Sequence, residues 1–303
     1  MKEKIRSAVL QLGADVCGFA SAKEFDQAPE GFRPGSIFKR CKSVIVFGIA
    51  LPRGLYEVDS RFAYSHYNSF VCPQADKIAL QAARLLEDRF EACAVPLPCD
   101  SPYEYWDEEK MEGRGLISMK HAACLAGLGT LGKNTLLLNK DYGNRLVVGC
   151  VLSDLDIEPD EKTVSICPDN CRQCIENCPQ GAIKSGFVEQ KPCRLFSYGK
   201  TKRGFETVEC NRCRTVCPMG FGIRKGKEKS MKKIDCLGEI CPVPVMKLQA
   251  VMDSIQKGED YLLVTDHSCT ISNLESFCKA NKLSYQLDEV MNGVWEITVS
   301  ASR

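Results

Sequence analysis

The sequence predicts an α/β protein in which a cysteine-rich segment separates two regularly folded parts. Three observations support this prediction. Apolar residues repeat with helical and strand periods over residues 1–163 and again over residues 233–303. Residues 164–222 instead carry closely spaced cysteines and turn-forming residues with little periodicity. The length of 303 residues is enough for two or three domains.

The first part alternates helical and strand patterns. Ile5, Val9 and Leu12 share one face of an amphipathic helix near the N-terminus. The apolar runs and stripes that follow predict, in order, a strand at 15–20, a buried strand at 43–51, a helix at 75–90, a helix at 117–128 and a strand at 145–152. This mixture predicts an α/β layer domain over residues 1–163.

A basic linker, residues 223–232, precedes the last part. Six of the ten residues from Arg224 to Lys233 are Lys or Arg, so a solvated linker and a docking patch for an anion are both open. Residues 233–303 then predict a strand, a helix at 242–258, a strand, a second helix and a hairpin that turns at Met-Asn-Gly. The order βαβαββ predicts a small two-layer α/β sandwich.

Composition and charge narrow the class of protein. The net charge of +1 gives no global field that favours nucleic acid or membrane. Arg6, Gln11 and Asp15 interrupt the N-terminal apolar residues, so no signal-peptide core is expected. No apolar run reaches the roughly 18 residues of a spanning helix. We therefore expect a cytoplasmic protein without a membrane partner, in which clustered cysteines bind metal instead of forming disulfides.

Seven of the nineteen cysteines fall into two short runs. The runs read Cys167-x3-Cys171-x2-Cys174-x3-Cys178-Pro and Cys210-x2-Cys213-x3-Cys217-Pro. Two runs that each end in Cys-Pro match the bacterial ferredoxin pattern, in which the proline-marked cysteine ligates the other cluster. The spacing therefore predicts that residues 164–222 are a ferredoxin-type segment with two 4Fe–4S clusters.

The same pattern assigns four thiols to each cluster. Cluster one takes Cys167, Cys171, Cys174 and Cys217. Cluster two takes Cys178, Cys210 and Cys213, and its fourth ligand is Cys193, the cysteine that lies between the runs. Three residues, where two are usual, separate Cys167 from Cys171. Two structural zinc sites are the alternative, but the Cys-Pro endings favour iron.

A glycine-rich stretch in the first part is a candidate cofactor site. Glycines permit close approach of the backbone to a flat or phosphate-bearing cofactor. The candidate residues are Gly127, Gly129, Gly132, Lys133 and Asn134. Their spacing does not fit a Walker loop.

Three motifs in this order resemble epoxyqueuosine reductases. They are AGLGTLGKNTLLL, LSDLDI and the two Cys-Pro runs, preceded by the tyrosine-rich RFAYSHYNSF. That family shares the arrangement with the catalytic part of reductive dehalogenases, and the resemblance covers residues 1–222. It implies an oxidoreductase with cobalamin in the first domain and adjacent clusters that reduce it. It also implies an electron donor such as ferredoxin or flavodoxin, and tRNA as a partner on the basic linker.

This sequence departs from the family at one position. The family places a catalytic aspartate before its glycine-rich helix, and that register falls near Gly113 here. Asp107, Glu109 and Glu112 lie nearby but out of register. His66 and His121 are further candidate acids or cofactor neighbours, with a structural role as the alternative.

The last part carries Gly238-x-x-Cys241-Pro-x-Pro at a predicted strand–helix junction. This motif and the βαβαββ order resemble TusA-type sulfur carriers over residues 233–303. The helix N-terminus stabilises negative charge on Cys241, and a thiolate accepts sulfane sulfur from a donor such as a cysteine desulfurase. A buried inert thiol is the alternative for Cys241. Cys269 is a candidate resolving thiol, with packing as the alternative.

The sequence thus predicts an enzyme that joins an iron–sulfur oxidoreductase, with cobalamin implied, to a persulfide carrier that acts in sulfur transfer or reduction. Two other hypotheses stay open. One is a non-catalytic electron and sulfur carrier for a partner enzyme. The other is epoxyqueuosine reduction in tRNA modification.

Overall fold

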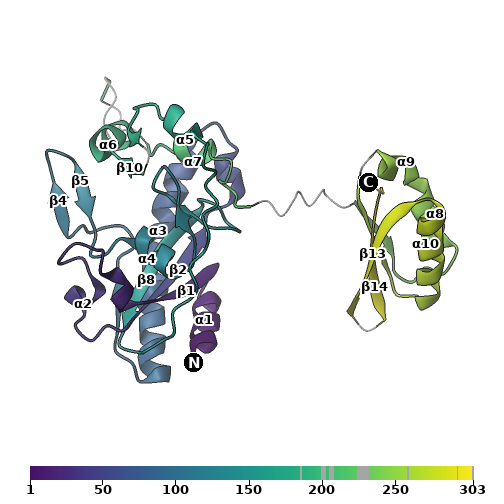
Figure 1. The fold of residues 1–303 in the computed structure, drawn as a ribbon, viewed down its shortest axis with the longest axis horizontal. Helices are drawn as coiled ribbons and strands as arrows, with labels where there is room; N and C mark the ends of the chain where they lie inside the picture. The colour runs from purple at the N-terminus through teal and green to yellow at the C-terminus, as the bar shows by residue number, and fades with distance from the viewer. Residues whose placement is uncertain are drawn as a thin grey trace. The chain divides into compact units, whose positions relative to one another are not determined.

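The computed structural model describes residues 1–184, 186–198, 203–204, 208–223, 232–257, 259–291 and 293–301. Contacts divide the chain into two compact units, Met1–Arg224 and Lys225–Arg303 (Figure 1). The cysteine-rich segment therefore belongs to the same compact unit as the predicted α/β layer domain. Most of the predicted basic linker, residues 224–231, lies outside the described residues.

A four-stranded antiparallel sheet forms the centre of the first unit. Its strands, in spatial order, are β1 (Val16–Ser21), β2 (Ser43–Ala50), β8 (Leu146–Ser153) and β3 (Ala94–Leu97). All three neighbouring pairs are antiparallel. The two central strands are buried along most of their length, which explains why their sequences are nearly continuous apolar runs.

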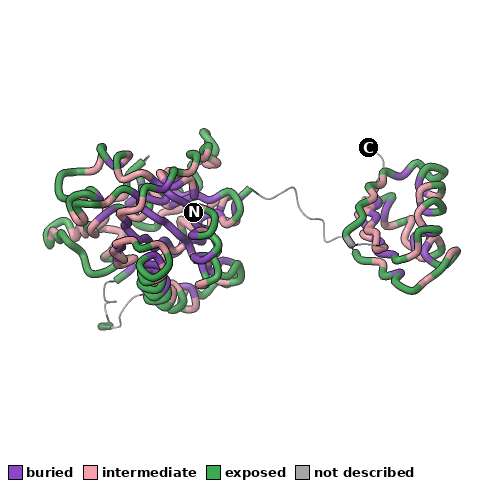
Figure 2. Tube along the Cα trace, turned by 90° about the horizontal axis from the view of Figure 1, so that it is seen from below, coloured by how far each residue is buried: buried purple, intermediate pink, exposed green. Residues whose placement is uncertain are grey.

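Helices cover both faces of this sheet. Alternate residues of β2 point to opposite faces, so Ile45 joins one core cluster and Val46 joins another. The first cluster includes apolar residues of α1 (Lys2–Gln11) and α3 (Arg61–Phe90), and the second includes residues of α4 (Met119–Leu125). Figure 2 shows the buried residues gathered inside the unit. The predicted α/β class is confirmed, as a sheet between two helical layers.

Helix α3 is longer than the sequence predicted. It begins at Arg61 instead of residue 75, and the Ser60 hydroxyl caps it by accepting from the Phe62 N–H at 3.4 Å. Pro73 lies inside the helix, and the polar and aromatic residues before it lack an apolar stripe. This is why the periodicity missed the first half. The tyrosine-rich segment 61–70 is therefore helical.

Short elements complete the first unit. Before the cysteines they are η1 (Ala22–Phe25), α2 (Pro34–Ile37), η2 (Arg53–Tyr56), β4 (Tyr105–Asp107), β5 (Glu112–Arg114), β6 (Thr130–Leu131) and β7 (Leu137–Leu138). The cysteine-rich segment adds α5 (Gln173–Glu176), β9 (Ile183–Lys184), β10 (Phe187–Val188), α6 (Gln190–Tyr198) and α7 (Arg212–Thr215). Figure 1 shows the hairpin β4–β5 projecting from the sheet, and α5, α6 and α7 gathered near the start of α3.

The second unit has the predicted βαβαββ order. Its elements are β11 (Lys232–Cys236), α8 (Val243–Ala250), α9 (Met252–Gln256), β12 (Tyr261–Thr265), α10 (Ser268–Ala280), β13 (Leu283–Met291) and β14 (Val294–Ala301). The sheet order is β11-β12-β14-β13, with β11 and β12 parallel. The predicted helix at 242–258 is broken at Val251 into α8 and α9. Leu248, Ile255 and Leu274 of the helices pack on Leu263 of the sheet.

Among the described residues, we find no helix with both the length and the apolar character needed to cross a bilayer.

Candidate functional site

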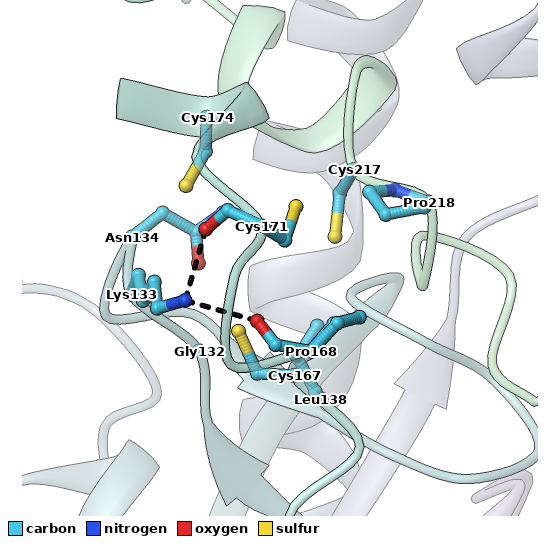
Figure 3. A pocket seen from close by; sticks show the side chains of 10 residues that line it. All are labelled: Gly132, Lys133, Asn134, Leu138, Cys167, Pro168, Cys171, Cys174, Cys217 and Pro218. Atoms are coloured by element: carbon cyan, nitrogen blue, oxygen red, sulfur yellow. Dashed lines mark hydrogen bonds between the residues drawn. The ribbon is translucent and has the colours of Figure 1, made fainter. Parts of the chain in front are cut away.

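Four thiols from the two cysteine runs line one cavity of the first unit. They are Cys167, Cys171, Cys174 and Cys217. Figure 3 shows their sulfur atoms directed toward a shared space. Cys174 lies on α5, whereas Cys217 lies just after α7, so the fold brings the end of the second run to the start of the first. Gly132, Lys133, Asn134, Leu138 and two prolines form the remaining wall.

Burial and mutual repulsion act on the thiols of this cavity. Burial raises the pKa of Cys174, and the charges of Cys167 and Cys171 raise it further. Burial likewise raises the pKa of Cys217, and the other three thiols add to the effect. Four thiolates at such a site therefore need a compensating positive charge, which a bound metal centre supplies.

A second group of thiols lies around α6. Burial raises the pKa of Cys193, and the charges of Cys178 and Cys210 raise it further. Burial also raises the pKa of Cys213 to about 11, with Cys210 and Cys193 among the other causes. The structure therefore places these four thiols within electrostatic reach of one another. Their role as iron ligands, like that of the first four, stays a prediction.

The described residues contain no three His, Cys, Asp or Glu side chains that are placed to hold a single metal ion. The four sulfur atoms in Figure 3 surround a space and do not converge on one point.

Lys133 and Asn134 anchor both cysteine runs to the first unit. The Lys133 ammonium group donates to the carbonyl oxygens of Pro168 and Cys171, each at 2.9 Å, and also to that of Asp169 (Figure 3 shows the first two). The buried Asn134 donates its amide N–H to the Cys213 carbonyl at 3.0 Å. These two candidate cofactor residues therefore contact the cysteine-rich backbone directly.

The glycines beside them pack against the chain itself. Gly127 has φ +70°, and a Cβ there would lie 2.4 Å from the Glu161 carbonyl oxygen. Gly129 would place a Cβ 2.4 Å from the Leu138 carbonyl oxygen. Both glycines thus allow a close approach within the unit. A role for Gly127, Gly129, Gly132, Lys133 and Asn134 in binding a cofactor stays a prediction.

The candidate carboxylates near the position of the family's catalytic aspartate lie on the hairpin β4–β5. Asp107 pairs with Glu112 across the hairpin and accepts the Lys110 backbone N–H at 2.8 Å. That hydrogen bond lowers the pKa of Asp107. Glu112 forms an ion pair with Arg114 at 2.8 Å. Two of the three candidate acids therefore have partners within the hairpin, and the N–H partner of Asp107 favours its ionised form.

The two candidate histidines lie on different helices. On α4, burial lowers the pKa of His121, and its Nδ1 atom lies 2.7 Å from the Ser118 hydroxyl. On α3, the ring of His66 stacks on Phe70 and meets Tyr67 edge to face.

Sequence reasoning missed a half-buried carboxyl group next to the second cysteine run. Glu209 accepts from the Asn68 amide at 2.8 Å and from the Tyr198 hydroxyl at 3.1 Å. Its backbone N–H donates to Ser65. Burial raises the pKa of Glu209. The tyrosine-rich segment of α3 thus contacts the residue before Cys210, and only the glutamate in ECNRC signals this in the sequence.

A pair of cysteines outside the two runs was also missed. A hydrogen bond between the thiols of Cys99 and Cys72 on α3 lowers the pKa of Cys72, and the Cys72 thiol also lies 3.4 Å from the Asn68 carbonyl oxygen, to which it donates when protonated. The Cys99 backbone N–H donates to Asp76, one helical turn from Cys72, at 2.7 Å. No spacing rule links these two positions, because the contact depends on where β3 ends beside α3.

In the second unit, Cys241 lies immediately before the N-terminus of α8. The Asn273 amide donates to its Sγ atom at 3.0 Å, and the Thr270 hydroxyl lies 3.8 Å from it. Cys241 is partly exposed. The neighbouring exposed apolar residues are Leu237, Ile240, Val243 and Met246. The predicted strand–helix position of Cys241 holds, whereas its partner Asn273 comes from α10.

Comparisons with known proteins agree with this division. The family model described as sulfurtransferase TusA matches residues 232–301. The epoxyqueuosine reductase of Bacillus subtilis (strain 168) is 23% identical over 257 residues, which are 73% of this chain and 64% of that protein. The chain therefore spans less than two thirds of the length of this relative.

Solved structures show the fold of the first unit. An epoxyqueuosine reductase solved with an epoxyqueuosine-modified tRNA-Tyr stem loop matches with a TM-score of 0.52 and 18% identity, over 75% of this chain and 66% of that chain. The catabolic reductive dehalogenase NpRdhA matches with a TM-score of 0.57 and 20% identity, over 84% and 36%. The resemblance stated from the sequence is confirmed: the chain joins a part that is similar to epoxyqueuosine reductases to a C-terminal TusA domain.

Proposed function

We propose that the first unit is an iron–sulfur oxidoreductase of the epoxyqueuosine reductase type, which reduces a modified nucleoside of tRNA. The observation that carries the proposal is the cavity lined by thiols of both cysteine runs. The relatives support the reaction class, because they are named epoxyqueuosine reductases and one was solved with a modified tRNA stem loop. This reading takes precedence over a sulfur-reducing role for the whole chain.

The residues present suit two 4Fe–4S clusters. Thiolates are the ligands of such clusters, and four surround the first cavity. When bound, the clusters store and pass single electrons. The four thiols around α6 would hold the second cluster. Lys133 and Asn134 fix both runs on the sheet unit, so the two thiol groups keep one relative geometry.

Cobalamin is implied by the resemblance and stays a prediction. Backbone carbonyl groups of the chain occupy the space where a Cβ of Gly127 or Gly129 would lie. These two glycines therefore leave no open surface there for a flat cofactor. Equilibrium titration of the cluster-loaded protein with hydroxocobalamin tests the prediction. Saturable binding with a spectral change supports it, and the absence of binding contradicts it.

Reduction of an epoxide to an alkene takes up two protons, so the site needs a proton donor. Asp107 is poorly suited, because the Lys110 N–H lowers its pKa. Glu109 lies in the connection between β4 and β5 and is the other candidate acid named from the sequence that we test. Glu109→Gln should reduce turnover and leave the iron content unchanged, whereas Asp107→Asn should affect turnover less.

Metal analysis tests the proposed clusters first. Protein purified without oxygen should contain about eight iron ions and eight sulfide ions per chain, as two 4Fe–4S clusters require. Cys217→Ser should damage one cluster and Cys193→Ser the other, with separable electron paramagnetic resonance signals after reduction. Cys278→Ser, in the second unit, is the matched control. Zinc in place of iron, or loss of the same signal in both variants, would overturn the assignment.

An activity assay tests the proposed substrate. A tRNA stem loop that carries epoxyqueuosine is incubated with reduced, cluster-loaded protein and cobalamin, and its nucleosides are analysed by mass spectrometry. We expect loss of one oxygen atom from the modified nucleoside with wild-type protein and none with Cys217→Ser. An unchanged nucleoside, in protein with full iron content, would favour the alternative of an electron carrier.

A second function is supported for the TusA domain. Its residues match the sulfurtransferase model, and the Asn273 amide lies 3.0 Å from Cys241 Sγ. A hydrogen bond of this kind stabilises a thiolate, which is the form that accepts sulfane sulfur. Incubation with a cysteine desulfurase and cysteine should add one sulfur atom to Cys241. Peptide mapping that places the sulfur mainly on Cys236 or Cys278 would refute the assignment.

A further inference from the structure

A second accessible thiol lies beside Cys241. Cys269 is exposed in the first turn of α10. Its carbonyl oxygen lies 4.0 Å from the Cys241 Sγ atom. The Asn273 amide donates to that carbonyl at 3.2 Å and to Cys241 Sγ at 3.0 Å. One side chain therefore ties both residues together.

Helix geometry places the Cys269 side chain on the face that meets Cys241. Cys269 and Asn273 are four residues apart on α10, so their side chains lie on one face of the helix. Asn273 uses that face to contact Cys241 Sγ. Cys269 thus lies on the same face, one turn closer to the helix N-terminus.

The other thiols of this unit are not comparable. Cys236 and Cys278 are fully buried, and burial raises the pKa of each to about 11. Neither forms the nucleophilic thiolate readily near neutral pH. Among the described thiols of the second unit, Cys269 alone combines exposure with a position next to Cys241.

We propose that Cys269 is a resolving thiol, which releases the sulfane sulfur carried by Cys241 as sulfide. This inference rests on the proposed persulfide function of Cys241. The Cys269 thiolate attacks the Sγ atom of Cys241, which is the inner sulfur of the persulfide. A disulfide forms between Cys241 and Cys269, the sulfur–sulfur bond of the persulfide breaks, and the terminal sulfur leaves as hydrogen sulfide with the Cys269 proton. The two thiols are oxidised and the sulfane sulfur is reduced.

The Asn273 amide is the positioning group for this step. Because it donates to Cys241 Sγ from α10, it holds the attacked sulfur against the helix that carries the nucleophile. The resulting disulfide returns to two thiols when it takes up two electrons and two protons. The reductant is a low-potential iron–sulfur centre or an external dithiol. The clusters proposed for the first unit are one source of these electrons.

The test separates sulfur loading from sulfur release. Full-length protein is loaded without oxygen by a cysteine desulfurase and cysteine, then desalted. Sulfide is measured over time, and peptides are mapped by mass spectrometry. Wild-type protein should release about one sulfide per Cys241 persulfide and yield a peptide in which Cys241 is linked to Cys269. Cys269→Ser should load normally and release sulfide at least tenfold more slowly.

A displaced thiol is the matched control. Cys269→Ser/Ser276→Cys keeps the number of thiols but moves one of them seven residues along α10, about 10 Å. It should behave as Cys269→Ser does. Mild oxidation of unloaded wild-type protein with diamide gives a second measurement, and it should link Cys241 to Cys269.

The outcomes distinguish the resolving role of Cys269 from the persulfide function of Cys241. Sulfide release by Cys269→Ser at the wild-type rate, or a disulfide between Cys241 and another cysteine, would overturn the resolving role while the persulfide function stands. Failure of Cys241 to take up sulfur in the wild-type protein would overturn the persulfide function, and the resolving role with it.

Discussion

Replacing Lys133 with methionine tests whether this residue stabilises the first cysteine run. The ammonium group donates to the carbonyl oxygens of Pro168, Asp169 and Cys171, all in the loop that carries two thiols of the cavity. Methionine keeps an unbranched apolar side chain but removes all three donors. We expect Lys133→Met to fold, because the lysine is partly exposed, and to hold the cluster proposed for this cavity less tightly.

The magnitude follows from the number of bonds and their exposure. A hydrogen bond from a charged donor contributes about 1.5–3 kcal/mol where water is excluded. Lys133 is partly exposed, so water competes for its hydrogen bonds and reduces their net contribution. We therefore expect the three bonds together to stabilise the loop by about 1–3 kcal/mol. Since about 1.4 kcal/mol corresponds to a factor of ten, the loop should open roughly 5- to 150-fold more often.

The assay is the rate at which an iron chelator bleaches the cluster absorbance without oxygen. Lys133→Met should bleach faster than wild type in one of two phases, whereas Lys140→Met, a nearby exposed lysine, should not. Bleaching of Lys133→Met at the wild-type rate would refute the anchoring role. Loss of hydroxocobalamin binding with unchanged bleaching would instead favour the role in cofactor binding that the sequence predicts.

Three further predictions concern stability and reactivity. Leu263→Ala, at a fully buried position of the second unit, should lower its free energy of unfolding by about 2–5 kcal/mol in urea titrations and leave iron content unchanged. Iodoacetamide should label Cys72 more slowly in Cys99→Ala at neutral pH, because the Cys99 hydrogen bond lowers the pKa of Cys72; an unchanged rate would contradict that bond. Burial opposes the ionisation of Asp160. The cations Arg6 and Lys2 of α1 outweigh this effect, so the pKa of Asp160 is lowered. The stability that ionised Asp160 contributes is fully present above its unfolded-state pKa and is lost as pH falls through its folded-state pKa. Asp160→Asn should therefore lower the free energy of unfolding of the first unit at pH 7. It should also make that free energy less dependent on pH in acid unfolding experiments.

Patterns with a strong period were predictable from the sequence. The strands β2 and β8 are buried on both faces, so each shows a nearly continuous apolar run of the length typical of a central strand. The βαβαββ order of the second unit follows from alternating periods and a hairpin signal. Where periodicity was weak, prediction failed. The first half of α3 has no apolar stripe, and Pro73 suggests a break that the helix does not make.

The residues of the candidate sites likewise divide into those that a local pattern predicts and those that it does not. Residues that belong to short motifs, such as Cys241 with its flanking prolines, were found because local spacing reports local geometry. Their partners were not found, because they come from distant segments. Asn273 reaches Cys241 only after α10 packs beside α8, and Asn134 reaches Cys213 only after the cysteine-rich segment folds onto the sheet unit. Spacing rules carry no information about such contacts.

Both proposed reactions take up two electrons, which suggests a reason for the presence of both units on one chain. A carrier that passes sulfane sulfur to an acceptor needs no electrons, whereas one that releases sulfide through Cys269 needs two to restore its thiols. Reduction of an epoxide to an alkene also takes two electrons. Each 4Fe–4S cluster passes one electron at a time, so two clusters store one such pair. If both proposals hold, the exposed Cys269 beside Cys241 gives the TusA domain a use for an electron pair of the kind that the proposed reaction of the first unit also consumes. If sulfide release proves independent of Cys269, the electron pair has no role in the TusA domain, and the two units act on separate reactions.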